Sequence, residues 1–231
     1  MKALTKKDYN LAYTALLYGF FLTFLLVTRY FARYAPIANP DPDRPYAWQF
    51  FYLFTFQNNI LVAVWAWMFA LSSFFRWDKI YTFVTKKIVL MALTVNIAIV
   101  FLIVLFVLNP VFAGQWDPFE SSSEIITHNA TPFFMFFMFF FIRGNGSLKN
   151  LDAIYALIYP FVYFIIHTII GSTLTFRDGA PAFNYGFINP GNYPNVFVFA
   201  LVFIALVAIF GAFGWLLIQF KKHLESHYYD L

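Results

Sequence analysis

The residues best suited to chemistry form one polar run at positions 54–59, with the sequence FTFQNN, inside an otherwise apolar segment from Ala47 to Phe75. A hydroxyl group and several carboxamides lie close together there. In hydrocarbon each such group costs free energy unless it finds a hydrogen-bond partner or lines a cavity. A functional site is therefore a better explanation for this run than helix packing alone.

The composition is that of a membrane protein. The chain has 231 residues, of which 61% are hydrophobic and 11% charged, and its mean hydropathy is +0.68. These values lie outside the range of soluble globular domains. The chain contains no cysteine, so disulfides, thiol nucleophiles and thiolate metal sites are excluded.

Six segments are apolar over about the 20 residues that a helix needs to cross roughly 30 Å of hydrocarbon. They lie at residues 11–31, 47–75, 88–108, 125–142, 153–174 and 196–220. The first is long enough to span and lacks a convincing small-residue cleavage site, so we expect a mature helix and not a signal peptide. The sequence thus predicts an all-α fold, a polytopic bundle of six transmembrane helices forming one domain over residues 1–231.

The distribution of basic residues predicts the orientation of this bundle. An even number of helices places both termini on one side, and Lys and Arg favour the cytoplasmic side. With the N-terminus inside, the inner segments carry Lys2, Lys6, Lys7, Arg76, Lys79, Lys86, Lys87, Arg143, Lys149, Lys221 and Lys222, whereas the outer ones carry Arg29, Arg33, Arg44 and Arg177. We therefore predict cytoplasmic termini and attribute the net charge of +4 to topology and not to nucleic-acid binding.

This topology brings three polar positions to a similar depth. Thr55 lies about eight residues, or roughly 12 Å, below the outer end of the second helix. His128 lies in the first turn of the fourth predicted helix, and His167 in the outer half of the fifth. We expect these side chains to share one layer near the outer face.

Helical spacing suggests which side chains point together. Thr55, Asn58 and Asn59 share a face, with Tyr52 one turn above them, whereas Gln57 is rotated toward packing or a neighbouring helix. A second pattern, at four-residue intervals, comprises Tyr155, Tyr159, Tyr163, His167 and Gly171. This pattern is also typical of helix packing, with hydroxyls bonded to neighbouring helices.

Thr55 and His128 together could perform acyl transfer. A buried threonine hydroxyl is more often bonded to a carbonyl of its own helix, which remains the alternative for Thr55. An imidazole at the same depth could accept the hydroxyl proton as attack begins. Asn58, Asn59 and Tyr163 are candidates to stabilise an oxyanion, and His167 and Tyr52 are further candidates for substrate binding.

Other chemistries have little support in the sequence. Inside the predicted spans no histidine or carboxylate pair has metal-ligand spacing, and His223 and His227 have it in the tail, where we expect solvated residues. Glycine fingerprints for phosphates and dinucleotides are absent. No carboxylate lies within the six spans, which disfavours a proton-coupled transporter. We expect no metal and no cofactor.

The polar run resembles a known signature. Residues 54–59 are similar to the Phe-Thr-x-Gln-(Ser/Thr)-Asn motif of bacterial six-helix membrane proteins related to the androgen-induced gene 1 and androgen-dependent TFPI-regulating proteins. His128 followed by Pro132 resembles their second motif. Tyr159-Pro160, Tyr163, Gly171 and the segment 187–190 (FINP) resemble later features. The resemblance extends from about Phe51 to Pro190.

This resemblance implies an intramembrane threonine hydrolase that uses Thr55 as nucleophile and His128 as base. It also implies a bacterial cytoplasmic membrane and fatty acyl ester substrates, such as the fatty acid esters of hydroxy fatty acids that animal members cleave. Asn58 departs from the motif, where Ser or Thr is usual. Membrane lipids are the expected partners, and the sequence leaves open whether the chain forms a homo-oligomer.

Two other interpretations of the polar layer remain at this stage. One is a bundle that binds or transports a small lipid without catalysis. The other is a structural membrane protein whose polar layer only joins helices. A hydrogen bond between Thr55 and His128 beside a cavity would favour the hydrolase.

Overall fold

The computed structural model describes residues 5–34, 51–108, 121–175, 182–183 and 185–228, and in this part of the chain every regular element is a helix. The longer α-helices are α1 (Lys6–Arg29), α3 (Phe54–Phe74), α5 (Lys87–Ile103), α8 (Thr131–Phe141), α10 (Ile158–Thr173) and α11 (Val196–Tyr228). Short α-helices are α4 (Asp78–Val84), α7 (Ser122–Ile125) and α9 (Asp152–Tyr155). Single π or 3-10 turns are η1 (Tyr30–Tyr34), η2 (Val104–Leu108), η3 (Ile126–Ala130), η4 (Gly186–Ile188) and η5 (Pro190–Asn192).

Five helical stretches in the described residues are long and apolar enough to cross a membrane. They are Lys6–Ala32, Phe54–Phe74, Lys87–Leu108, Asp152–Thr173 and Val196–His227. These stretches confirm the all-helical class, and their length and composition are those of a membrane protein. Of the predicted second span, residues 47–50 lie outside the described residues, and the helix itself begins at Phe54.

The predicted span 125–142 is not confirmed as a membrane-crossing helix. Its residues belong to α7, η3 and α8, which follow one another without a break from Ser122 to Phe141, but they are not among the five stretches that are long and apolar enough to cross a membrane. Pro132 distorts this helix because it has no N–H and its ring crowds the carbonyl of residue 128. The chain widens into a π turn there, and the N–H of Thr131 donates to the carbonyl of Ile126, five residues back.

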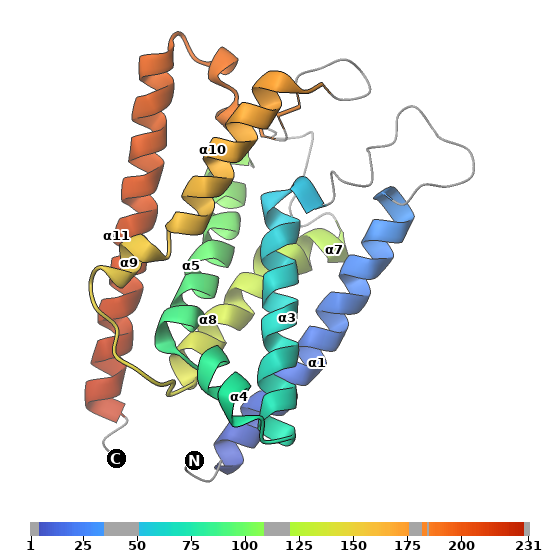
Figure 1. Ribbon diagram of the computed structural model, residues 1–231, viewed down its shortest axis with the longest axis vertical. Coiled ribbons are helices and arrows are strands. Elements are labelled where there is room, and N and C mark those ends of the chain that lie inside the picture. Colours follow the sequence, from blue (N-terminus) through green and yellow to red (C-terminus); the bar gives the residue numbers. More distant parts are fainter. Residues whose placement is uncertain (1–4, 35–50, 109–120, 176–181, 184, 229–231) are drawn as a thin grey trace.

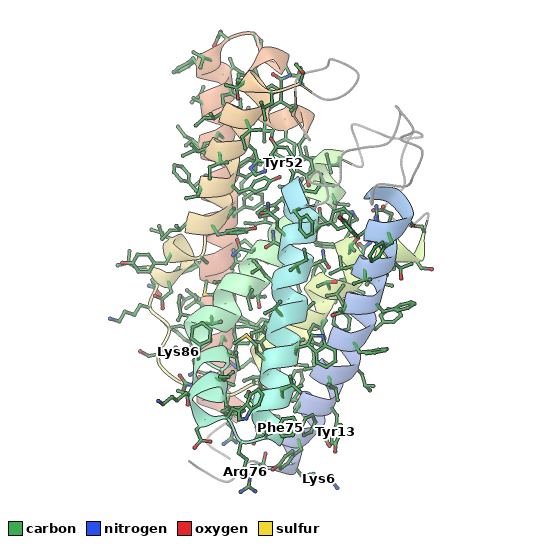
Figure 2. All side chains as sticks on the ribbon, turned by 45° about the vertical axis from the view of Figure 1, so that its right-hand side comes forward. Lys6, Tyr13, Tyr52, Phe75, Arg76 and Lys86 are labelled. Carbon is green, nitrogen blue, oxygen red and sulfur yellow. The ribbon has the colours of Figure 1, made fainter. Side chains whose placement is uncertain are left out.

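Figure 1 shows how the helices are arranged. α1 and α3 lie on one side of the bundle, α10 and α11 on the other, and α5 and α8 between them. The first described turn of α1 and the last of α11 lie at the same end (Figure 1). Lys6, Arg76 and Lys86 mark that end in Figure 2, whereas Tyr52 lies toward the opposite end.

Small residues let α1 and α3 pack closely. Ala12, Ala15 and Gly19 on α1 are buried, as are Ala63 and Ala66 on α3. A Cβ atom on Gly19 would lie 3.2 Å from the Cβ of Ala66, tighter than an ordinary contact. Close approach of small residues is a common way for helices to associate in lipid, where the surroundings are as apolar as the helices.

A second proline interrupts the predicted span 153–174. Pro160 cannot donate to the carbonyl of Ala156, and its ring crowds that carbonyl, so α9 ends at Tyr155 and α10 begins at Ile158. Tyr155 is consequently 58% exposed and falls out of the predicted stripe. The later members of that stripe, Tyr163, His167 and Gly171, are buried as expected.

The last helix continues beyond the predicted end at Phe220, since α11 extends to Tyr228. His223 and His227 are exposed, as expected, although on a helix and not in an irregular tail. Lys221 is 1% exposed, and its Nζ donates to the carbonyls of Phe140 at 3.1 Å and Ile142 at 2.8 Å. A cation thus satisfies carbonyls at the C-terminal end of α8, where the helix dipole is negative.

Replacement of Gly19 by leucine tests the packing of α1 on α3. Gly19→Leu places a branched side chain against Ala66 and should lower the thermal unfolding temperature of the detergent-solubilised protein by several degrees, about 1–3 kcal/mol of overpacking strain. Leu17→Phe is the matched control, since Leu17 is 70% exposed on the same helix. Equal unfolding temperatures for the two variants would contradict this packing.

Candidate functional site

A hydroxyl from α10 fixes the start of α3. The N–H of Phe54 donates to the hydroxyl of Tyr163 at 3.0 Å, and that hydroxyl donates to the carbonyl of Tyr52 at 2.9 Å. Tyr163 therefore satisfies one of the amide groups that a helix N-terminus leaves without a partner. These two bonds hold the first turn of α3, which contains Thr55, against α10.

Thr55 differs from most of the other helical threonines. Thr23 donates to the carbonyl of Gly19, and Thr94 to that of Leu90, in the usual bond to the fourth residue back. The Thr55 side chain is buried, at 8% exposure, yet its hydroxyl makes no hydrogen bond to any described residue. The alternative in which the helix occupies this hydroxyl is therefore not observed.

Thr55 lines a small apolar cavity between α3, α5 and α10. The cavity has about 10 Å³ of room, close to that of one water molecule. Its walls are otherwise aliphatic and aromatic: Phe54, Val100, Ile103, Val104, Leu108, Tyr163, Phe164, Tyr185 and Phe187. The hydroxyl thus faces apolar surroundings without a competing donor or acceptor from the described residues.

Asn59 connects α3 to the turn that holds His128. Its Nδ2 donates to the carbonyl of Thr55 at 2.8 Å and to that of Thr127 at 3.0 Å. Its Oδ1 accepts from the hydroxyl of Thr131 at 2.8 Å, and Tyr18 on α1 donates to that hydroxyl at 2.8 Å. The network joins α1, α3, η3 and α8. Nothing in the spacing of the sequence pointed to Tyr18.

The other predicted oxyanion donors are also engaged. Asn58 donates to the carbonyl of Phe54 at 2.8 Å, and the one hydroxyl hydrogen of Tyr163 is given to Tyr52. Their role at an oxyanion stays a prediction. Gln57 accepts from the hydroxyl of Tyr159 on α10 at 2.5 Å, which confirms that it faces a neighbouring helix.

His128 lies in η3 and is held by a carboxylate. Its Nε2 is 2.8 Å from Glu124 Oε2, and Glu124 Oε1 is 2.5 Å from the guanidinium of Arg29. The same guanidinium donates to Ser123 at 2.8 Å. All three charged or titratable side chains are between 10% and 14% exposed, so this cluster is largely shielded from solvent.

The cluster stabilises the charged form of Glu124. Burial alone would raise the pKa of its carboxyl, but the hydrogen bond from His128 and the charge of Arg29 outweigh burial and lower the pKa from 4.5 to about 2. Sequence reasoning missed this residue because the predicted helix began at Ile125. The four-residue spacing of Glu124 and His128 could have indicated the pair.

No hydrogen bond joins the Thr55 hydroxyl to His128 in the described part of the chain. The two residues are linked indirectly, since Asn59 bonds both the carbonyl of Thr55 and that of Thr127, the neighbour of His128. Catalytic hydrogen bonds are often long or absent before substrate binds. The geometry therefore places Thr55 and His128 on two segments joined by Asn59 without a direct bond.

His167 belongs to an aromatic cluster beyond the first turn of α3. Its Nδ1 lies 2.8 Å from the carbonyl of Tyr163, and its ring packs 3.6 Å from that of Tyr163 and 4.0 Å from that of Tyr52. The hydroxyl of Tyr52 donates to the carbonyl of Ala182 at 3.1 Å. Here Tyr52 and His167 join α10 to the segment after it, and no described hydrogen bond connects His167 to Thr55.

Gly171 permits the same segment to lie against α10. A Cβ atom at this position would lie 2.3 Å from the ring of Phe183, a distance that no real contact shows. The absence of a side chain thus lets Phe183 pack directly on the helix backbone. Phe187, four residues later in the sequence, lines the cavity beside Thr55.

The described residues contain no group of three or more His, Asp or Glu side chains placed to hold a metal ion. Comparison with protein-family models, with curated proteins and with solved structures gives no match for this chain. The candidate site is therefore defined by its own geometry.

Exchange of Glu124 for glutamine tests the charged cluster. Because the folded-state pKa of Glu124 lies below its ordinary value, the stability that its charge contributes is complete above about pH 4.5 and is lost as the pH falls toward 2. Glu124→Gln should lower the unfolding temperature near neutral pH, and the difference from the parent protein should shrink below pH 4.5. Thermal unfolding of both proteins in detergent, from neutral pH down to about pH 3, measures this difference in unfolding temperature.

Asp78→Asn is the matched control, because Asp78 is an exposed carboxylate on α4. Its effect on the unfolding temperature should be small. A difference between Glu124→Gln and the parent protein that stays constant from neutral pH down to pH 3 would contradict the assigned ion pairs.

Proposed function

We propose that this chain is an intramembrane lipid ester hydrolase in which Thr55 is the nucleophile. The observation that carries the proposal is Thr55 itself: its side chain is largely buried, lines a cavity and lacks the helix carbonyl bond that most of the other helical threonines make. A base must take the hydroxyl proton as attack begins, and in Thr55 no helix carbonyl holds that proton. The resemblance of residues 54–59 to the threonine hydrolase motif supports the same assignment.

His128 is the proposed base, and Glu124 orients it. A carboxylate on one imidazole nitrogen fixes the ring and stabilises the imidazolium that forms when the other nitrogen takes a proton. Glu124 occupies Nε2 at 2.8 Å, so Nδ1 is the nitrogen that would act on Thr55. The two side chains must close on each other when substrate enters, a rearrangement that the small size of the cavity also requires.

The proposed reaction has two steps. In the first, Thr55 Oγ1 attacks the acyl carbonyl and its proton passes to His128; the ester C–O bond then breaks, and the alcohol leaves with that proton. In the second, water attacks the acyl-threonine while His128 takes a proton from it. The Thr55–acyl bond breaks, the carboxylic acid leaves, and the proton returns to Thr55 Oγ1.

The position of Thr55 on α3 assists this chemistry. Thr55 is the second residue of a helix of 21 residues, and the N-terminus of a helix carries partial positive charge. Negative charge that develops on the acyl oxygen would therefore be favoured there, most strongly in a site that excludes water. Asn58 retains a second amide hydrogen for the same purpose, since one bond to Phe54 uses only one of its two.

Fatty acyl esters are the proposed substrates, with fatty acid esters of hydroxy fatty acids as the class that the motif resemblance suggests. The proposed setting is a bacterial cytoplasmic membrane with both termini inside. The basic residues of the described chain support this orientation, because Lys6, Arg76 and Lys86 gather at one end of the bundle (Figure 2), opposite the end near Thr55. The site would then act near the outer leaflet.

A lipid-binding bundle without catalysis is the second candidate. The missing hydrogen bond between Thr55 and His128 and the apolar walls of the cavity favour it. In this case the polar layer would orient a neutral head group. Binding of a fatty acyl ester without its turnover, unchanged by loss of the Thr55 hydroxyl, would distinguish this function from hydrolysis.

Removal of the Thr55 hydroxyl tests the hydrolase. Thr55→Val keeps the side-chain shape and should abolish labelling by a fluorophosphonate probe and reduce ester hydrolysis at least ~1000-fold, whereas Thr55→Ser should keep part of both. Thr94→Val is the matched control, because Thr94 is a buried threonine whose hydroxyl bonds its own helix. Undiminished labelling of Thr55→Val would exclude Thr55 as the nucleophile.

Single cysteines test the orientation, and the chain offers a clean background because it has none. A membrane-impermeant maleimide should label Ser172→Cys, at the exposed C-terminal end of α10, in intact cells. It should label Lys222→Cys, exposed near the end of α11, only after the membrane is permeabilised. The opposite pattern of labelling would reverse the proposed orientation.

A further inference from the structure

An apolar groove runs between α10 and α11. It has a volume of about 610 Å³, within the range of small-molecule sites. Thr168 is the one polar side chain among its walls; the others are Phe161, Phe164, Ile165, Ile169, Val196, Phe199, Ala200, Phe203, Ile204 and Val207. The groove opens on a side of the bundle where α11 is scarcely buried by other helices, so it faces the hydrocarbon.

The groove continues toward Thr55. A smaller space of about 10 Å³ shares Phe164, Phe199 and Phe203 with the groove, and shares Phe164 and Phe187 with the cavity beside Thr55. Phe164 thus lines all three spaces. Its side chain is 6% exposed and stands between the lipid-facing groove and the proposed nucleophile.

Aromatic rings close the path at this point. The ring of Phe164 meets that of Phe187 edge to face at a centroid distance of 5.8 Å, and that of Phe203 at 5.5 Å. Such pairs are held by weak, adaptable contacts, and a change of rotamer is fast for an aromatic ring that has room to move. Phe187 lies on the short turn η4, outside the long helices.

A second apolar groove lacks this continuity. It lies between α1 and α3, has a volume of about 330 Å³, and is lined by residues such as Thr23, Ile60 and Trp67. It shares no lining residue with the cavity beside Thr55. The groove between α10 and α11 therefore differs from the groove between α1 and α3, because only the former connects through shared lining residues to the cavity beside Thr55.

We infer that the groove between α10 and α11 binds the acyl chain of a membrane lipid ester, and that displacement of the Phe164 and Phe187 rings admits the ester carbonyl to Thr55. This inference rests on the proposed hydrolase function. An acyl chain is the expected occupant of the groove because the lining is apolar, the groove opens to hydrocarbon, and it shares wall residues with the space that leads to Thr55. The ester would thus enter sideways from the bilayer, with its acyl chain in the groove and its carbonyl at Thr55.

Substitution of Ala200 tests this inference through chain length. Ala200→Trp fills the groove on α11 without touching the cavity beside Thr55. We expect kcat/KM for p-nitrophenyl palmitate to fall at least ~10-fold, with less than a ~2-fold change for p-nitrophenyl acetate, which needs no long groove. Ile209→Trp is the matched control on the same helix, where Ile209 is 58% exposed and lines no groove described here.

A binding measurement separates failure of this inference from failure of the hydrolase. A diazirine-bearing palmitic acid in phosphatidylcholine vesicles should crosslink to α10 and α11 of the parent protein and of Ile209→Trp, and much less to Ala200→Trp. If the parent protein shows no esterase activity but its crosslinking is still lost in Ala200→Trp, the groove binds an acyl chain and the hydrolase function is rejected. Equal crosslinking and equal chain-length preference in Ala200→Trp and the parent protein would overturn the groove.

Discussion

The carboxamide of Asn59 is the interaction on which the candidate site depends. It is fully buried, and its three hydrogen bonds reach α3, η3 and the first residue of α8. In hydrocarbon a carboxamide without partners is costly, so each of these segments is held in the register that satisfies it. This one side chain thus links the turn that carries Thr55 to the turn that carries His128.

The candidate site is nearly closed in this structure. Many polar groups of the layer are hydrogen-bonded, the Thr55 hydroxyl not among them, and aromatic rings crowd the small cavity beside Thr55. Closing a site in this manner excludes water and strengthens electrostatic interactions within it. In the proposed hydrolase, substrate binding would have to supply the free energy that moves Phe164 and Phe187, so affinity and access would be coupled.

Much of this arrangement was predictable from the sequence. Hydropathy located the helical stretches, and four-residue periodicity placed Asn59, Tyr163 and His167 in the interior. The prolines set the limit. Pro132 introduces the π turn η3 into the helix that contains the predicted fourth span, and Pro160 separates α9 from α10, with Tyr155 exposed, because each removes a backbone donor whose loss a hydropathy window does not register.

Partnerships between distant residues were beyond the sequence. Tyr18 reaches Thr131, and Arg29 reaches Glu124, across about 100 positions of the chain. No local period encodes such pairs, since they depend on how helices cross. Glu124 is the exception, because its spacing from His128 was visible and only the assumed start of the helix concealed it.

Gly171 controls access to the site from a distance. The ring of Phe183 packs directly on Gly171, where a Cβ atom would leave no room for it. Phe187, which lines the cavity beside Thr55, follows four residues later. Any side chain at position 171 would displace the Phe183 ring without altering Thr55 or His128. In the proposed hydrolase, this position would therefore set how often the site opens, and a change there would retune the rate of exchange with the bilayer while leaving both proposed reacting groups intact.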